Sequence, residues 1–191
     1  MSINGVLLLK KPIGLSSNKA LQVVRTLFDG AKAGHTGTLD PQAEGVLPVC
    51  FGEATKFSQF LINSNKGYSV TMRLGWTSTS GDSEGKLTRE YLGVLPKKDD
   101  VARATQKFIG EVAQTPPMHS AIKNRGRRLY KLAREGISIP RSVRFIKIHE
   151  LSMGHLDGEF ASFNVVCSKG TYVRTLVEDI GIDLGCGAYV T

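Results

Sequence analysis

Residues 34–56 read GHTGTLDPQAEGVLPVCFGEATK, and both the fold and the chemistry of the chain can be approached from this stretch. Gly34 and Gly37 permit backbone conformations that bulkier residues exclude, so another chain can come close to them. Asp40 is followed by Pro41; Asp caps helices well, and Pro suits the first helical position. Asp40 is therefore either the N-cap of a helix or a functional carboxylate, and these residues alone leave both interpretations open.

The whole chain has 191 residues, which fits one domain or at most a closely associated pair. Its three cysteines, Cys50, Cys167 and Cys186, lie far apart and form no CxxC pair. This spacing predicts reduced thiols rather than a disulfide framework or a cysteine-based zinc site. The N-terminal residues have neither the basic lead of a signal peptide nor the apolar length of a membrane span. We therefore expect a cytoplasmic protein that does not contact a membrane.

Positive charge is concentrated between His119 and Lys147, where nine basic residues accompany a single acid, Glu135. The rest of the chain has sixteen residues of each sign, so this segment carries the entire net charge of +8. Such a concentration favours a polyanionic partner, because each neutralised phosphate releases condensed counterions. A solvated surface without a partner is the alternative. The basic residues are Lys123, Arg125, Arg127, Arg128, Lys131, Arg134, Arg141, Arg144 and Lys147.

Short strands and helices follow one another without the regular rhythm of a doubly wound sheet, which favours the α+β class. Strands are predicted at residues 6–9, 68–74, 143–151 and 160–167, and a glycine-rich loop at 33–41. Helices are predicted between a cap at Ser16 or Ser17 and Gly30, and at residues 54–62, 101–109 and 172–184. The side chains expected on their buried faces include Leu27, Phe28, Phe57, Phe60 and Leu61.

Several common chemistries have no motif in this sequence. A phosphate-binding GxxxxGK[ST] loop, a dinucleotide-binding GxGxxG loop, a zinc-binding HExxH helix and a GxSxG nucleophile turn are all absent. The four histidines are scattered along the chain, which argues against a histidine metal site. A reaction that needs no cofactor or metal, or binding without catalysis, remains.

Residues 34–56 closely resemble the catalytic motif of the TruB family of tRNA pseudouridine synthases. Five further blocks resemble that family in the same order, so the likeness covers nearly the whole chain. They are LKKPIGLSS at 9–17, KGYSV at 66–70, the segment 74–85 that ends in GDSEG, PPMHSAIK at 116–123 and CSKGTYVRT at 167–175. Two positions depart from the usual pattern: His119 stands where the family has tyrosine, and Ser78-Thr79-Ser80 replaces Thr-Asp-Thr.

The resemblance implies the pseudouridine synthase fold, a mixed and mainly antiparallel sheet with flanking helices and a central catalytic cleft. It implies that residues 1–191 form one catalytic domain with a basic RNA-gripping insertion at about residues 117–147. The C-terminal PUA RNA-binding domain that follows in the family is expected to be absent from this chain. The implied partner is the T stem-loop of tRNA, and we expect a monomer.

The implied activity is conversion of uridine 55 in the T loop of tRNA to pseudouridine. The reaction breaks the C1′–N1 bond, turns the uracil over and joins C5 to C1′. It consumes nothing and oxidises nothing, so no cofactor and no metal are expected. A stacked base cannot be reached in place, so it must be flipped into a pocket.

The resemblance also assigns roles to residues. Asp40 is expected to be the catalytic carboxylate, either as a nucleophile at C1′ or as a base toward the ribose, and the sequence leaves both routes open. Both routes need the ionised form, which a nearby cation favours. Arg174 is expected to be that cation. It falls in the first turn of the last predicted helix, where a positive charge opposes the helix dipole and an anionic partner is expected. A surface arginine is the alternative.

The remaining expected site residues each have a plainer alternative. Tyr68 is expected to stack on the target uracil and to assist proton removal at C5, although a core tyrosine would fit the strand equally. His35 is expected to act as a wedge in the space left by flipped bases, or as a surface hydrogen-bonding residue. Tyr172 is expected to order the region of Arg174 or to pack near the base. Lys11 and Lys56 are expected to contact phosphate or support the pocket, with solvated lysines as the alternative.

Within the basic segment, the expected contacts to the RNA backbone are Lys123, Arg125, Arg127 and Arg128. Backbone contacts of this kind position a stem rather than read its bases. Two other functional hypotheses compete with the synthase. One is a non-catalytic RNA-binding or tRNA-refolding module that uses the same basic segment. The other is a hydrolase of the glycosidic bond, which would release free uracil.

Overall fold

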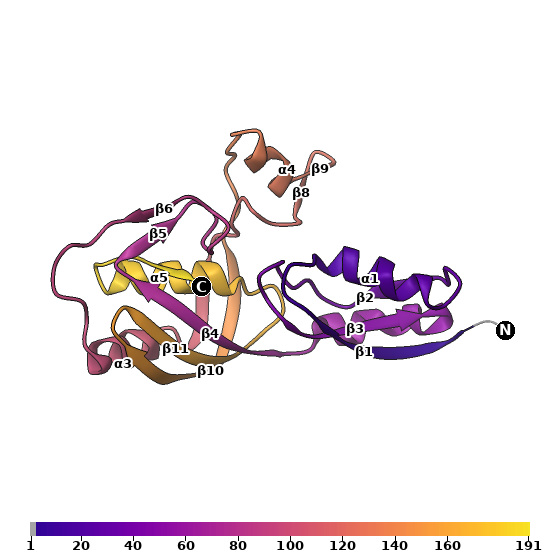
Figure 1. Cartoon of the computed structure of the whole chain (residues 1–191), viewed down its shortest axis with the longest axis horizontal. Coiled ribbons are helices and arrows are strands. Elements are labelled where there is room, and N and C mark those ends of the chain that lie inside the picture. Colours follow the sequence, from indigo (N-terminus) through magenta and orange to yellow (C-terminus); the bar gives the residue numbers. More distant parts are fainter. Residues whose placement is uncertain (1–2) are drawn as a thin grey trace. The chain divides into compact units, whose positions relative to one another are not determined.

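The computed structural model describes residues 3–191, which fold into two compact units with their boundary between Ser64 and Asn65 (Figure 1). The expected α+β class is confirmed, since both units combine helices with a sheet. All pairs of named strands are antiparallel, and a parallel bridge joins Asp82 to Val190. Among the described residues, no helix is long and apolar enough to cross a membrane.

The first unit is a three-stranded sheet with one main helix packed on it. Its elements are β1 (Gly5–Lys11), α1 (Ser17–Thr26), β2 (Ala33–His35), β3 (Gly45–Phe51), the 3₁₀ helix η1 (Gly52–Phe57) and α2 (Ser58–Asn63). The strand order is β1-β3-β2. Leu21 and Val24 of α1 are buried against Val49 and Phe51 of β3, which forms a small core. Ser16 caps α1 as expected, since its side chain accepts a hydrogen bond from the Lys19 amide at 3.2 Å.

Three predictions in this unit are wrong. The first residues of the expected glycine-rich loop form β2, which pairs with β3. Leu27 is 75% exposed because α1 ends one residue before it. The expected helix at 54–62 is divided into the 3₁₀ helix η1 and α2, and neither of them has a buried residue. Phe57 and Phe60 are exposed and stack on each other, with their ring centroids 6.4 Å apart.

The second unit is built on a five-stranded antiparallel sheet in the order β12-β4-β11-β10-β7. β4 spans Lys66–Leu74 and β11 spans Phe160–Cys167, close to the predicted strands. The other elements are β5 (Trp76–Ser78), β6 (Leu87–Arg89), α3 (Lys98–Gln106), β7 (Gly110–Gln114), β8 (Lys123–Asn124), β9 (Arg127–Arg128), α4 (Leu129–Arg134), β10 (Arg144–Asp157), α5 (Val173–Asp183) and β12 (Ala188–Val190).

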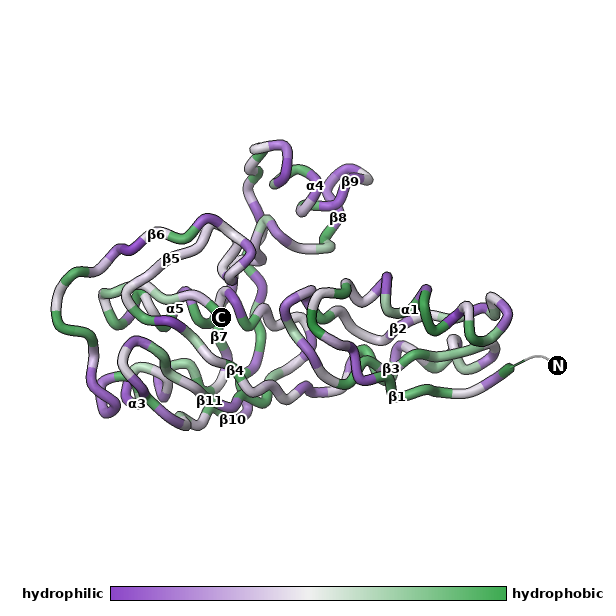
Figure 2. Tube along the Cα trace, viewed as in Figure 1, coloured by the Kyte–Doolittle hydropathy of each residue, from purple (hydrophilic) through white to green (hydrophobic). Residues whose placement is uncertain are grey.

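The core of the second unit lies between its sheet and the helices α3 and α5. Alternate residues of β4 face this core, so Val70, Met72 and Leu74 are buried while their neighbours are more exposed. Leu176 and Ile180 of α5 are fully buried against them. Figure 2 shows hydrophobic residues along α5 and the strands of this sheet. The packing places the N-terminus of α5, and with it Arg174, on a rigid scaffold.

The basic segment of the second unit forms a two-stranded hairpin followed by a short helix, which lie next to each other in Figure 1. Asn124 pairs with Arg127, so the turn has two central residues, Arg125 and Gly126. Their φ angles of +46° and +82° are the left-handed pair that a type I′ hairpin turn requires. Figure 2 colours the hairpin hydrophilic, and its basic side chains are exposed.

Candidate active site

Asp40 lies in a turn and not at the start of a helix, so its interpretation as a helix cap is wrong. The Asp40 carbonyl accepts a hydrogen bond from the Ala43 amide at 3.1 Å, which closes a β-turn with Pro41 at its second position. No helix follows before β3 begins at Gly45. Asp40 is half-buried. Helix capping therefore does not explain why a carboxylate stands at position 40.

The residues on both sides of Asp40 are anchored by the segment 11–17. The hydroxyl of Ser17, a residue 2% exposed, accepts a hydrogen bond from the Leu39 amide at 2.8 Å and donates one to the Leu39 carbonyl at 3.0 Å. The Gly14 amide donates to the Pro41 carbonyl at 2.8 Å. Because Leu39 and Pro41 are both held, the backbone of Asp40 has little freedom to move. The block LKKPIGLSS thus acts as a cradle for the Asp40 turn.

Lys11 completes this cradle from the buried end of β1. Its side chain is fully buried, and its Nζ donates to the carbonyls of Leu15 at 2.7 Å, Pro12 at 2.8 Å and Pro41 at 3.4 Å. Burial lowers the pKa of Lys11, and the negative charge of Asp40 partly offsets that effect. The three carbonyl acceptors around Nζ of Lys11 fit an ammonium group in the same unit as Asp40. Of the two roles expected for it, support of the site fits this geometry better than a phosphate contact.

His35 and Lys56 lie elsewhere in the first unit. His35 ends β2 and is half-buried, and its Nδ1 donates to the Gly37 carbonyl. The loop's own backbone therefore orients the imidazole ring. Lys56 is exposed and forms an ion pair with Glu53 one turn earlier. Its geometry is that of an ordinary surface lysine, and a contact between Lys56 and phosphate stays a prediction.

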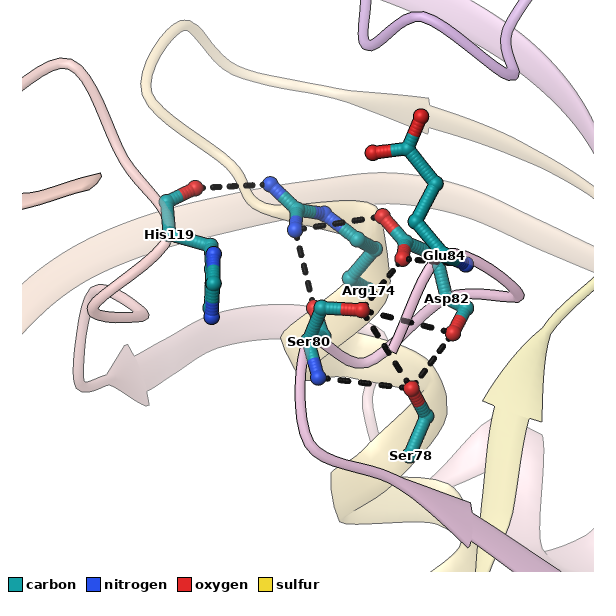
Figure 3. Close-up of polar contacts among 6 residues, drawn as sticks. All are labelled: Ser78, Ser80, Asp82, Glu84, His119 and Arg174. Atoms are coloured by element: carbon teal, nitrogen blue, oxygen red, sulfur yellow. Dashed lines mark hydrogen bonds and ion pairs between the residues drawn. The ribbon is translucent and has the colours of Figure 1, made fainter. Parts of the chain in front are cut away.

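Arg174 is the centre of a buried polar network in the second unit (Figure 3). It lies in the first turn of α5 as predicted, and it is 8% exposed, so the alternative of a surface arginine is wrong. Its Nη1 donates to the Ser80 carbonyl at 2.8 Å and lies 3.3 Å from Oδ2 of Asp82. Its Nη2 donates to the His119 carbonyl at 2.9 Å. Asp82 is thus an anionic partner of Arg174, and the expected pairing of Arg174 with Asp40 stays a prediction.

The loop that carries Asp82 is shaped by two serines and two glycines. Ser80 Oγ donates to Asp82 Oδ1, which also accepts from the Glu84 amide at 3.1 Å, and Ser78 Oγ donates to the Asp82 carbonyl. Gly81 has a φ of +77°, and a Cβ there would lie 3.2 Å from Cβ of Arg174. A Cβ at Gly85 would lie only 2.4 Å and 2.5 Å from the two serine hydroxyl oxygens. The sequence STSGDSEG therefore makes a tight turn that presents the Asp82 carboxylate to Arg174.

Tyr172 is held directly before α5 by a buried amide. Gln114, at the end of β7 and 2% exposed, accepts from the Tyr172 amide at 2.8 Å and donates to the Tyr172 carbonyl at 3.1 Å. This clamp orients the first turn of α5 and therefore Arg174, and the roles expected of the Tyr172 side chain stay predictions. Tyr68 on β4 is half-buried, with part of its ring packed against the core. Its expected contact with uracil stays a prediction.

Comparison with known proteins identifies the family of the chain. Residues 25–173 match the family described as TruB family pseudouridylate synthase (N terminal domain). The chain belongs to the TruB family. It is 54% identical over 189 residues to tRNA pseudouridine synthase B of Pseudomonas aeruginosa and 50% identical over 189 residues to that of Methylobacillus flagellatus. Each alignment covers 99% of this chain and 62% of the relative, so this TruB-family chain spans about three-fifths of the length of these proteins.

Solved structures confirm the pseudouridine synthase fold of this TruB-family chain. It matches a chain in the crystal structure of a Cbf5–Nop10–Gar1 complex with a TM-score of 0.75 and 31% identity, over 98% of this chain and 46% of that one. It also matches a chain of an H/ACA RNP bound to a substrate RNA containing 2′-deoxyuridine, with a TM-score of 0.71 and 28% identity. That match covers 98% of this chain and 45% of the other.

The expected RNA contacts of the TruB-family chain differ in their environment. Lys123, Arg125, Arg127 and Arg128 are all exposed on the hairpin. Arg127 is engaged in a two-pronged ion pair, since its Nη2 lies 2.6 Å and 2.7 Å from the carboxylate oxygens of Glu135. Arg128 makes no ion pair among the described residues. Arg127 must therefore give up a partner to bind phosphate, whereas Arg128 does not.

A further carboxyl group lies beside the arginine network of the TruB-family chain. Glu178 follows Arg174 by one helical turn on α5 and is half-buried. Burial raises the pKa of Glu178; the charges of Asp179 and Asp82 add to this rise, and Arg174 opposes it. This group was not among the residues expected from the sequence, because its helical spacing gives no sign of the charges around it.

Two further observations concern the rest of the described chain. Residues 3–191 contain no group of three or more His, Cys, Asp or Glu side chains arranged to hold a metal ion. A cavity of about 410 Å³ in the second unit is lined by residues that include Trp76, Arg89, Tyr91 and Glu159. None of the residues expected to act in the TruB-family reaction lines this cavity.

Proposed function

We propose that the protein is a tRNA pseudouridine synthase that converts uridine 55 of the T loop to pseudouridine. The family membership supports this proposal, as do relatives at 50–54% identity that are named tRNA pseudouridine synthase B. The observation that carries it is the Asp40 turn, in which a half-buried carboxylate is held at both neighbouring residues and does not cap a helix. A carboxylate placed in this way is suited to act on a bound substrate.

In this proposal the two units form one catalytic domain, and the target uridine is flipped out of the T loop. Asp40 acts at the ribose, as a nucleophile at C1′ or as a base. Tyr68 stacks on the uracil, and His35 occupies the space that the flipped base leaves. Arg174 supplies positive charge to the reaction centre, which favours the ionised form of Asp40. Tyr172 holds the start of α5 so that Arg174 points in a constant direction.

The insertion at residues 117–147 grips the RNA backbone in this proposal. Lys123, Arg125 and Arg128 lie on an exposed hairpin, where phosphates can approach. Leu129 and Leu132 of α4 are buried, which gives the hairpin a local apolar anchor. The three cysteines are free thiols, and together with a tRNA substrate they favour a cytoplasmic location. A monomeric state stays a prediction.

The variant Asp40→Asn tests the catalytic assignment. Asn suits the first position of a β-turn as well as Asp does, so folding and RNA binding should be retained. Loss of the carboxylate should lower the rate of pseudouridine formation by about 10²–10⁴-fold, the usual contribution of one positioned acid–base group. The rate is measured on unmodified T-arm RNA, with thermal unfolding and RNA binding as controls.

The same assay separates the competing functions. Pseudouridine from the wild-type protein and little from Asp40→Asn supports the synthase. Equal rates for the two proteins would show that Asp40 is not the catalytic group. Release of free uracil would identify a glycosidic hydrolase. RNA binding by the wild-type protein, with neither product formed, would identify an RNA-binding module.

A further inference from the structure

We propose that Ser80 is a positioning residue, whose hydroxyl orients the guanidinium of Arg174 through the carboxylate of Asp82. This inference rests on the proposed function, in which Arg174 acts at the reaction centre. Ser80 does not itself reach the substrate in this scheme. Its role is to keep the carboxylate that faces Arg174 in one rotational state.

Ser80 contacts both members of the ion pair, as Figure 3 shows. Its carbonyl accepts from Arg174 Nη1 at 2.8 Å, and its hydroxyl donates to Asp82 Oδ1. Arg174 is therefore fixed by the main chain of Ser80 and also by the carboxylate that the side chain of Ser80 holds. Arg174 Nη2 is tied to the His119 carbonyl as well, so the guanidinium bridges two loops and α5.

The hydroxyl matters because a carboxylate group rotates easily. The last torsion angle of Asp has a broad preference, so hydrogen bonds must select one orientation. Asp82 is 5% exposed, and its Oδ1 accepts from Ser80 Oγ and from the Glu84 amide at 3.1 Å. Its Oδ2 is left to face Arg174 at 3.3 Å. Without the Ser80 hydroxyl, Oδ1 keeps only the longer Glu84 contact among the described residues, and Oδ2 can turn away from Arg174.

The surrounding backbone is shaped to bring this hydroxyl to Asp82. Ser78 Oγ donates to the Asp82 carbonyl and lies 3.3 Å from Ser80 Oγ. Gly85 faces both hydroxyls, and a Cβ there would lie 2.5 Å from Ser80 Oγ and 2.6 Å from the Ser80 amide. Threonine, the usual residue of the TruB family at this position, also has a hydroxyl group. The replacement of Thr by Ser in this chain thus keeps the donor and removes only a methyl group.

A matched pair of variants tests the inference. Ser80→Thr keeps the hydroxyl, whereas Ser80→Val has the same shape as threonine without a hydroxyl. With T-arm RNA as substrate, we expect Ser80→Thr to keep kcat within about twofold and Ser80→Val to lower kcat about tenfold, since a hydrogen bond to a charged group is lost. KM should change little in both, because RNA contacts are untouched.

Ser162→Val is the control for a structural effect. The Ser162 hydroxyl accepts from the His155 amide at 2.8 Å and donates to the His155 carbonyl at 3.3 Å, outside the arginine network. We expect this variant to lower the free energy of unfolding but leave kcat unchanged. Equal kcat values for Ser80→Thr and Ser80→Val would overturn the inference.

A second measurement does not depend on activity. In ¹⁵N–¹H spectra the guanidinium of Arg174 should rotate slowly in the wild-type protein and in Ser80→Thr, and faster in Ser80→Val. Unchanged rotation in Ser80→Val would contradict the positioning role. If the wild-type protein formed no pseudouridine, the proposed function would fail, while these spectra would still decide whether Ser80 orients Arg174.

Discussion

Ser17 offers a direct test of how the Asp40 turn is held. The variant Ser17→Ala removes one buried oxygen and leaves both the amide and the carbonyl of Leu39 without their partner. Each of these two hydrogen bonds is worth about 1 kcal/mol net, and a buried peptide group left unpaired adds to the loss. We therefore expect the free energy of unfolding to fall by about 2–3 kcal/mol.

The same variant should impair catalysis, because Asp40 directly follows Leu39. A shift of about 1 Å in a reacting group can lower the rate about a hundredfold. We therefore expect kcat to fall by about tenfold or more. KM for T-arm RNA should stay nearly constant, since the basic hairpin is unchanged. Urea unfolding gives the stability, and single-turnover pseudouridine formation gives the rate.

Ser16→Ala is the matched control, since Ser16 is the neighbouring residue and caps α1. Loss of an N-cap costs about 1 kcal/mol, so this variant should be less destabilised than Ser17→Ala and should keep its kcat. Equal destabilisation by the two variants would show that the Leu39 contacts contribute no more to stability than one helix cap, against the expected loss of about 2–3 kcal/mol. A normal kcat in a destabilised Ser17→Ala protein would show that the position of Asp40 does not depend on them.

Three further predictions concern other charged groups. Lys11→Met removes the donor from the carbonyls of Pro12 and Leu15, so urea unfolding should show a loss of about 2–4 kcal/mol; an unchanged value would contradict the cradle. Because the pKa of Glu178 is raised in the folded protein, its ionisation opposes folding above that raised pKa, and this cost disappears below the ordinary value of 4.5. Glu178→Gln should therefore be more stable than the wild type at pH 8 and lose this advantage as the pH falls to 4, whereas lower stability at pH 8 would mean that attraction to Arg174 outweighs burial. Arg128→Gln should reduce the slope of log affinity for T-arm RNA against log salt by about one. Arg127→Gln should reduce this slope by less, because Glu135 already pairs with Arg127. Arg103→Gln on α3 is the control, and an unchanged slope for Arg128→Gln would remove the hairpin from the interface.

Much of the second unit could be predicted from periodicity. β11 has the predicted bounds, and α5 differs from the prediction by one residue at each end. The apolar spacing of α5 placed Arg174 in the first helical turn, and the helix dipole at that position indicated an anionic partner. The partner expected there is Asp40, and the contact with Asp82 could not be predicted, because Asp82 lies on a distant loop. Likewise, the short strand β7 and the clamp formed by Gln114 left no periodic pattern to recognise.

The predictions for the first unit failed where a local sequence preference for helix differs from the backbone in the folded protein. Asp-Pro is typical of a helix start, yet Asp40 lies in a β-turn because the peptides beside it are held by residues far away in the sequence. Phe57 and Phe60 have helical spacing, but a 3₁₀ turn precedes α2 and both rings are exposed. At Asp40 the local preference is weak compared with contacts that the sequence does not place next to each other.

Sequence patterns thus predicted the α+β class, five of the twelve elements of the second unit, the basic segment and the residues of the family motifs. These features depend on interactions between near neighbours along the chain, and such interactions leave a periodic pattern or a motif. The orientation of Asp40 and Arg174 depends on hydrogen bonds across long separations, 22 residues between Ser17 and Leu39 and 58 between Gln114 and Tyr172. Close to each of these two residues, one buried polar side chain forms hydrogen bonds with both the amide and the carbonyl of a single residue. Only folding brings such partners together, because the donors and acceptors that must be satisfied are defined once the surrounding residues are buried.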